Sequence, residues 1–134
     1  PNMEYKILIE LVHKLDKPEN AEFAATNVAR LINLHGVGGV KPENLKVVVV
    51  VHAGATNSML NAEAYKTKYE VDSPYAPLYE ELMEAGVEVV VCGQSYSMYG
   101  NKVEDLMPGV KIGTSALTTI STYQLKGYAF FKWD

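Results

Sequence analysis

The sequence of 134 residues contains only one cysteine, Cys92, and one tryptophan. A single cysteine permits no internal disulfide, which excludes a disulfide-stabilised scaffold and favours a reducing compartment such as the cytoplasm. The chain begins with Pro1 and Asn2 ahead of Met3, so an exported form that has lost a signal peptide stays open. Close ligand pairs such as C-x-x-C are missing too, and we expect neither a metal site nor another cofactor.

Basic residues and long apolar segments are also scarce. The 12 Lys and Arg residues are scattered among 16 Asp and Glu residues, and the formal net charge is −4. Without a basic stripe to neutralise phosphates, nucleic acid is a poor candidate partner. The longest apolar run, residues 47–51, falls far short of the roughly 20 residues that span a bilayer, so we expect no membrane segment.

The rest of the composition is that of an ordinary folded protein. Hydrophobic residues make up 48% and charged residues 21% of the chain, close to the averages of globular domains. The length suits a single domain with a substantial core, and neither a repeat nor a linker interrupts the sequence. We therefore expect one domain over residues 1–134.

Apolar runs and helical periodicities alternate along the chain. Strands are predicted at residues 5–13, 45–54, 87–93, 110–113 and 128–133. Helices are predicted at residues 19–35 and 58–68, before Gly86, shortly after residue 94 and at residues 114–126. This alternation predicts an α/β fold, a three-layer α/β/α domain with a mainly parallel sheet of about five strands.

Three chemically active side chains fall at the ends of predicted strands. His13 ends the first strand, His52 the second and Cys92 the third. Ligands and chemistry gather at the carboxyl ends of the strands in open parallel sheets. The three side chains could therefore share one crevice if their strands are neighbours.

Cys92 allows two interpretations, an inert core thiol or an exposed nucleophile. Free cysteines are commonly buried, but Cys92 stands before a predicted helix, where backbone N–H groups would lower the pKa of its thiol. If Cys92 is a nucleophile, we expect its sulfur to be open to solvent. Gly93 would permit the tight turn, and Gln94 and Ser95 would supply hydrogen-bond donors to a bound anion or persulfide.

The two histidines also keep two interpretations. His52 could act as a base or hydrogen-bond partner of the thiol, and His13 could line the same crevice. Both could instead simply bond neighbouring backbone carbonyls. The loop "AGATNS", residues 53–58, could cradle a small anion through its N–H groups or merely cap the next helix.

Nine tyrosines are present, and many of them lie in the middle of the chain. Aromatic residues with a polar tip are favoured at interfaces and pocket walls. A homo-oligomer would explain the cluster; partly buried packing with bonded hydroxyls would explain it equally well.

Longer segments, taken together, resemble a known family. The segments are "VVVVVHAGA", "LMEAGVEVVVCGQS" and "DLMPGVKIGTSALTTISTYQLKGYAFFK". In this order they resemble the DsrE/DsrF-like family, which includes sulfur-relay, TusD-like proteins, over residues 5–132. The resemblance implies a DsrE-like, flavodoxin-like fold that assembles as trimers, hexamers or mixed complexes. In the sulfur-relay members, a cysteine after the third strand accepts sulfane sulfur as a persulfide, and Cys92 falls at that position.

The leading hypothesis is therefore a small sulfur carrier of the sulfurtransferase type, with Cys92 as the persulfide site. Its partners would be sulfur donor and acceptor proteins or small thiols, because the chain has no second cysteine to resolve the persulfide. The alternative is a non-catalytic oligomeric protein that binds a small ligand or anion, with Cys92 only lining the pocket.

Overall fold

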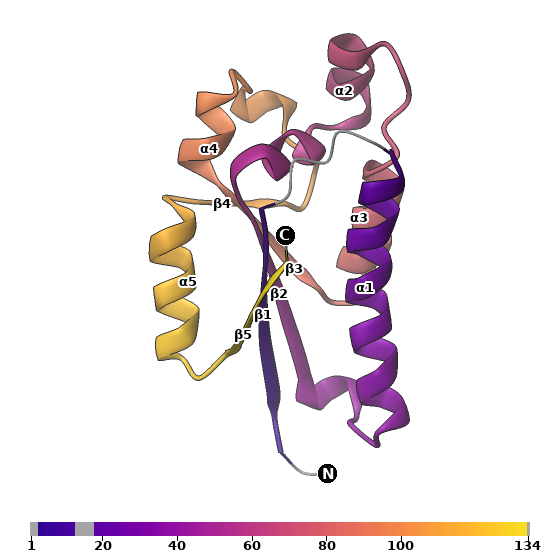
Figure 1. Ribbon diagram of the computed structural model, residues 1–134, viewed down its shortest axis with the longest axis vertical. Helices are drawn as coiled ribbons and strands as arrows, with labels where there is room; N and C mark the ends of the chain where they lie inside the picture. Colours follow the sequence, from indigo (N-terminus) through magenta and orange to yellow (C-terminus); the bar gives the residue numbers. More distant parts are fainter. Residues whose placement is uncertain (1–2, 13–17, 134) are drawn as a thin grey trace.

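The computed structural model describes residues 3–12 and 18–133, and it describes the side chains of the first helix from residue 26 onward. Five strands form one parallel sheet in the order β4-β3-β2-β1-β5, with helices on both faces (Figure 1). The strands are β1 (Tyr5–Leu11), β2 (Leu45–Val51), β3 (Glu88–Cys92), β4 (Lys111–Gly113) and β5 (Ala129–Trp133).

Five α-helices and three short 3-10 helices connect these strands in the part of the chain that the structure describes. The α-helices are α1 (Pro18–Val37), α2 (Ala62–Tyr69), α3 (Ala76–Glu84), α4 (Gly93–Met98) and α5 (Ala116–Leu125). The 3-10 helices are η1 (Pro42–Asn44), η2 (Ala53–Met59) and η3 (Val103–Asp105). None of the described helices is both long and apolar enough to cross a membrane.

The valine run of β2 is buried on both faces of the sheet. Val49 and its odd-numbered neighbours face the larger core cluster, against which α1 and α3 pack. Val48 and Val50 belong to the smaller cluster on the opposite face, together with Leu8 of β1 and residues of α5. A β-branched run without polar interruption is what a strand covered on both faces requires.

The helices lie on both faces because the path of the chain reverses. The chain adds β2, β3 and β4 successively on one side of β1, and then returns past β1 to add β5 on the other side. The crossover helix α5 lies on the face opposite α1 and α3 (Figure 1). A constant right hand of parallel crossovers requires this change of face when the direction reverses.

The predicted fold class and order of elements are confirmed, and the differences are local. The helix predicted at 58–68 is divided into η2 and α2, because Leu60 forms an antiparallel bridge with Leu106. Asn61 then caps α2 by accepting a hydrogen bond from Ala64 N at 2.8 Å. With this polar cap, the helix starts at Ala62, four residues later than predicted.

The central tyrosines mostly serve packing in this chain. Tyr75, Tyr79 and Tyr96 are buried, and the Tyr96 hydroxyl donates to Lys102 O at 2.8 Å. Burial raises the pKa of Tyr79 to about 12. The rings of Tyr65 and Tyr69 contact each other at a tilt of 40°, with centroids 4.6 Å apart, and they lie nearer the surface.

Candidate functional site

Cys92 is the last residue of β3 and the N-cap of α4. Its side chain lies on the α5 face of the sheet, in the same cluster as Val90, Val50 and Ala116. In the β3–β4 register its partner is Gly113. The sequence therefore places the only cysteine at the carboxyl edge of the sheet, as predicted.

The expectation that the Cys92 sulfur is open to solvent is wrong for this chain. Cys92 is only 2% exposed. Ala116, the first residue of α5, packs in the same cluster, so the start of that helix covers the thiol. This contact joins residues 24 positions apart, and the local sequence around Cys92 gives no sign of it.

Hydrogen bonds at the sulfur nevertheless favour its thiolate form. Burial raises the pKa of the Cys92 thiol, but the Ser95 hydroxyl and the backbone N–H groups of Ser95, Ala116 and Gln94 lower it by more. The net pKa lies below the ordinary value of 9.0. Ser95 N donates to Cys92 Sγ at 3.5 Å. The predicted lowering is confirmed in direction, and its donors come from the starts of both α4 and α5.

Two glycines allow the backbone to close around this sulfur. A Cβ atom on Gly93 would lie 2.8 Å from Gly113 O and 3.1 Å from Ile112 Cγ2. A Cβ atom on Gly113 would collide with the Thr119 hydroxyl. Any larger residue would push α4, β4 or α5 away from Cys92, so Gly93 is needed for the close approach of β4 to the start of α4 rather than for a positive φ.

His52 stands beside Cys92 on the next strand. β2 pairs with β3 through Val51 and Val91, so the next residues in this register are His52 and Cys92. His52 continues the extended conformation of the strand, with φ −132° and ψ 160°. Because side chains alternate along an extended chain, His52 projects from the same face as Val50 and as Cys92.

Glu10 of β1 lies beside His52, so Glu10, His52 and Cys92 form a row across three neighbouring strands. Glu10 was not among the residues predicted from the sequence. Its carboxylate Oε1 lies 3.2 Å from His52 Nδ1. The Glu10 side chain is 9% exposed, and the His52 side chain is 32% exposed. The signal was present in the strand "YKILIEL", because a glutamate within an apolar strand is unusual enough to need a partner.

The backbone after His52 is strained. Ala53 has a positive φ of 53°, a conformation that residues with a side chain rarely adopt. Thr56 Oγ1 donates to Ala53 O at 2.8 Å, and Ser58 Oγ donates to Ala55 O at 2.6 Å. These hydroxyls therefore bond their own loop, which fits local capping of η2. His13, the third predicted strand-end residue, lies outside the described residues.

A groove passes between α5 and the β3–β4 edge, close to the sulfur. It has a volume of about 420 Å³. Val90, two residues before Cys92 on the same face, lies on its wall with Thr119, which contacts the Gly113 position. Other lining residues are Lys111, Ile112, Thr114 and Thr118. Cys92 itself does not line the groove, but Val90 of the same strand face does.

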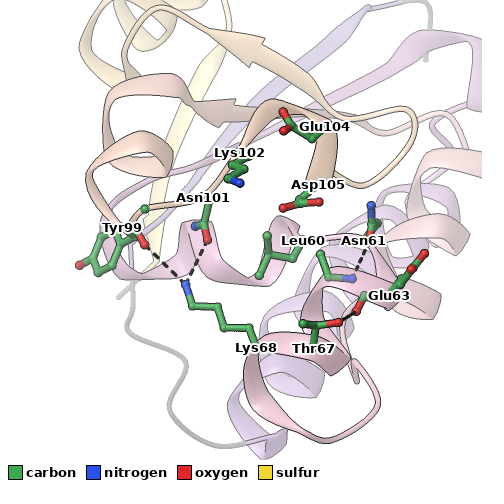
Figure 2. A pocket seen from close by; sticks show the side chains of 12 residues that line it. Leu60, Asn61, Glu63, Thr67, Lys68, Tyr99, Asn101, Lys102, Glu104 and Asp105 are labelled. Atoms are coloured by element: carbon green, nitrogen blue, oxygen red, sulfur yellow. Dashed lines mark hydrogen bonds between the residues drawn. The ribbon is translucent and has the colours of Figure 1, made fainter.

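A larger cavity of about 550 Å³ lies apart from this row, between α2 and residues 99–105 (Figure 2). Lys68 reaches across its mouth, where Nζ donates to Asn101 Oδ1 at 3.1 Å and to Tyr99 O at 3.5 Å. Glu63 and Asp105 place carboxylates on its wall. None of the residues predicted from the sequence lines this cavity. In the described part of the chain, no group of three His, Cys, Asp or Glu side chains is arranged to hold a metal ion.

Comparisons with solved structures show the fold, and a comparison with protein-family models shows the family. A protein of unknown function from Methanobacterium thermoautotrophicum, MTH1491, superimposes with a TM-score of 0.75 at 21% identity, covering 97% of this chain and 100% of that one. The ychN protein from E. coli has a TM-score of 0.65 at 16% identity, covering 98% of this chain and 100% of that one. No curated protein sequence matches the chain significantly. The model of the DsrE/DsrF-like family matches residues 6–133, and the chain therefore belongs to the DsrE/DsrF-like family.

Proposed function

We propose that this protein carries sulfane sulfur as a persulfide on Cys92. The Cys92 thiolate attacks the outer sulfur of a donor persulfide, a new S–S bond forms, and the donor leaves as a thiolate. An acceptor thiolate later attacks the outer sulfur of Cys92–S–SH, and Cys92 leaves as a thiolate. The sulfane sulfur changes hands without net oxidation or reduction, and no prosthetic group is needed.

The observation that supports this proposal best is the set of hydrogen-bond donors around the sulfur. N–H groups from the starts of α4 and α5 and the Ser95 hydroxyl lower the pKa of Cys92 despite its burial. A thiol that served only to fill the core would need no such donors. The same groups stabilise the thiolate that leaves when sulfur is passed on, so they favour both loading and release.

Donor access requires a small movement of the covering residues. The groove of about 420 Å³ is the described cavity nearest to Cys92 along its strand, since Val90 and Thr119 line it. Displacing the first turn of α5 would open the sulfur to this groove. We therefore expect Cys92 to react with small reagents in the native state, but more slowly than a fully exposed thiol.

We further propose that the protein works as a homo-oligomer, as a trimer or hexamer, and exchanges sulfur with donor and acceptor proteins or small thiols. Both edge strands carry exposed apolar side chains, Ile112 on β4 and Phe130 and Phe131 on β5. Leu117 and Leu125 are exposed on α5. Such apolar edges favour association. Light scattering should give a mass several times 14.8 kDa; a monomer at micromolar concentration would refute the oligomer.

The direct test of sulfur carriage is the intact mass after incubation with a small persulfide donor. We expect wild type to gain one sulfur atom, which dithiothreitol removes, and Cys92→Ser to gain none. Ser97→Cys, which adds a thiol at an exposed position of α4 to the Cys92→Ser background, is the matched control for nonspecific persulfidation. If the control and wild type gained equal amounts of sulfane sulfur, Cys92 would have no special role as the persulfide site.

The cavity beside α2 favours a second candidate function, binding of a small polar ligand. Its volume of about 550 Å³ lies within the usual range of ligand sites. Lys68 could bind an anionic group of the ligand, while Glu63 and Asp105 could bind a cationic one. This candidate can be tested by differential scanning fluorimetry, which measures the Tm of wild type and Lys68→Ala in the presence of a panel of amino acids and nucleotides. Stabilisation of wild type alone would support it, and no stabilisation by any compound would refute it for these classes.

A further inference from the structure

Glu10, His52 and Cys92 form a row across three neighbouring strands. The sheet order β3-β2-β1 puts His52 between the other two residues. All three side chains lie on the α5 face at the carboxyl edge, and the Glu10–His52 contact of 3.2 Å demonstrates that the first two meet. The register of β2 and β3 sets the third beside them.

The contact with Glu10 determines which nitrogen of the His52 ring can accept a proton. A carboxylate accepts hydrogen bonds and donates none, so the neutral His52 ring donates from Nδ1 and keeps its lone pair on Nε2. The two ring nitrogens point in diverging directions. Because Nδ1 contacts Glu10, Nε2 points away from that carboxylate, and β3 with Cys92 is the strand on the other side of β2.

We propose that His52 is the base that takes the proton of the incoming acceptor thiol, and that Glu10 is the positioning residue that holds its ring. This inference rests on the proposed sulfur-carrier function and assigns its release step. The acceptor R–SH gives its proton to Nε2, and R–S⁻ attacks the outer sulfur of Cys92–S–SH. R–S–SH and the Cys92 thiolate form, and the His52 proton passes to solvent.

The resting structure explains why His52 would serve release rather than loading. The Cys92 sulfur already accepts a hydrogen bond from Ser95 N, and backbone donors lower its pKa without any contribution from His52. Loading is therefore assisted by donors that already contact the sulfur, and His52 is not among the groups that lower the pKa of Cys92. A persulfide extends the side chain by one S–S bond of about 2.05 Å, and the acceptor thiol must approach beyond that outer sulfur. His52 is the most exposed of the three residues and so is the one that an entering thiol can meet.

Within residues 3–12 and 18–133, the register of the sheet places a lysine beside the row. Lys132 of β5 is the register partner of Glu10 on the same face, and it is exposed. The ion pair that the structure gives Glu10 is with His52. A glutamate at the opposite end of β1 offers a control, because Glu4 pairs with Lys46 and lies far from the carboxyl edge.

The test separates loading from release in four variants. Wild type, Glu10→Gln, His52→Gln and the control Glu4→Gln are loaded with a small persulfide donor, and loading is measured by intact mass. Release to excess β-mercaptoethanol is then followed in a single turnover. We expect loading to be unchanged in all four proteins. Release should slow on the order of 100-fold in His52→Gln and on the order of 10-fold in Glu10→Gln, and Glu10→Asp should recover part of the loss.

Nitrogen NMR shows which ring nitrogen of His52 carries the proton. This proton position should change on mutation of Glu10 only if Glu10 orients the ring. In wild type we expect a proton on Nδ1 and none on Nε2, and we expect Glu10→Gln to weaken this preference. Unchanged release in Glu10→Gln and His52→Gln, with loading intact, would overturn the inference and leave the carrier function standing. A wild type that never loads would instead refute the carrier function. If Glu10→Gln does not fold, a wild-type His52 protonated on Nε2 alone would still overturn the inference.

Discussion

Replacement of Gly93 by alanine should damage both the stability of the protein and the chemistry of its thiol. The new Cβ would stand 2.8 Å from Gly113 O, whereas ordinary contacts begin at 3.4 Å. The carbonyl belongs to the backbone of β4, so relief requires β4 and the start of α4 to separate. Overpacking of this kind costs about 1–3 kcal/mol, and each kcal/mol lowers the Tm by about 4 °C for a domain of this size.

The same separation moves the N–H groups of Gln94 and Ser95 away from the sulfur, so the pKa of Cys92 should rise. Thermal unfolding and the pH dependence of thiolate absorbance measure the two effects. Gly36→Ala is the matched control, because Gly36 lies in α1 with no atom near its Cβ position, and it should stabilise by about 0.5–1 kcal/mol. If Gly93→Ala keeps the wild-type Tm and Cys92 pKa, the close-approach argument fails.

Two further predictions concern pH and packing. Because the Cys92 pKa is lowered from 9.0 in the folded state, the unfolded chain holds more protons between that lowered pKa and 9.0. The free energy of unfolding of wild type, relative to that of Cys92→Ser, should thus rise with pH through this window and level off above it. Urea titrations of both proteins at several pH values measure this difference. A difference that does not change with pH would contradict the prediction. Leu8→Ala, at a fully buried position, should cost about 2–5 kcal/mol in urea unfolding. Leu34→Ala, at an exposed position of α1, should change stability by less than about 0.5 kcal/mol, and equal losses would refute the assignment of the core.

The strands and their order along the chain could be predicted because their signals are local. The valines of β2 predict a strand covered on both faces, and that strand is buried as expected. The carboxyl-edge rule then selected His52 and Cys92, which do lie on one face of the sheet. These inferences need only residues that are neighbours in sequence.

The pairing and the burial at the site could not be predicted in the same way. Glu10 meets His52 because β1 and β2 are adjacent in the sheet, and the sequence does not state the strand order. Ala116 covers Cys92 because α5 returns across that face, which depends on the packing of a helix that starts 24 residues later. Contacts between distant segments therefore decide how exposed the thiol is.

Native-state alkylation of Cys92 tests the central claim most directly. The protein is treated with iodoacetamide at several pH values, with and without denaturant, and modification is followed by intact mass. The account predicts that folded protein is modified, with a pH midpoint below 9.0, the ordinary value for a thiol. A Cys92 that reacts only after denaturant is added would contradict it.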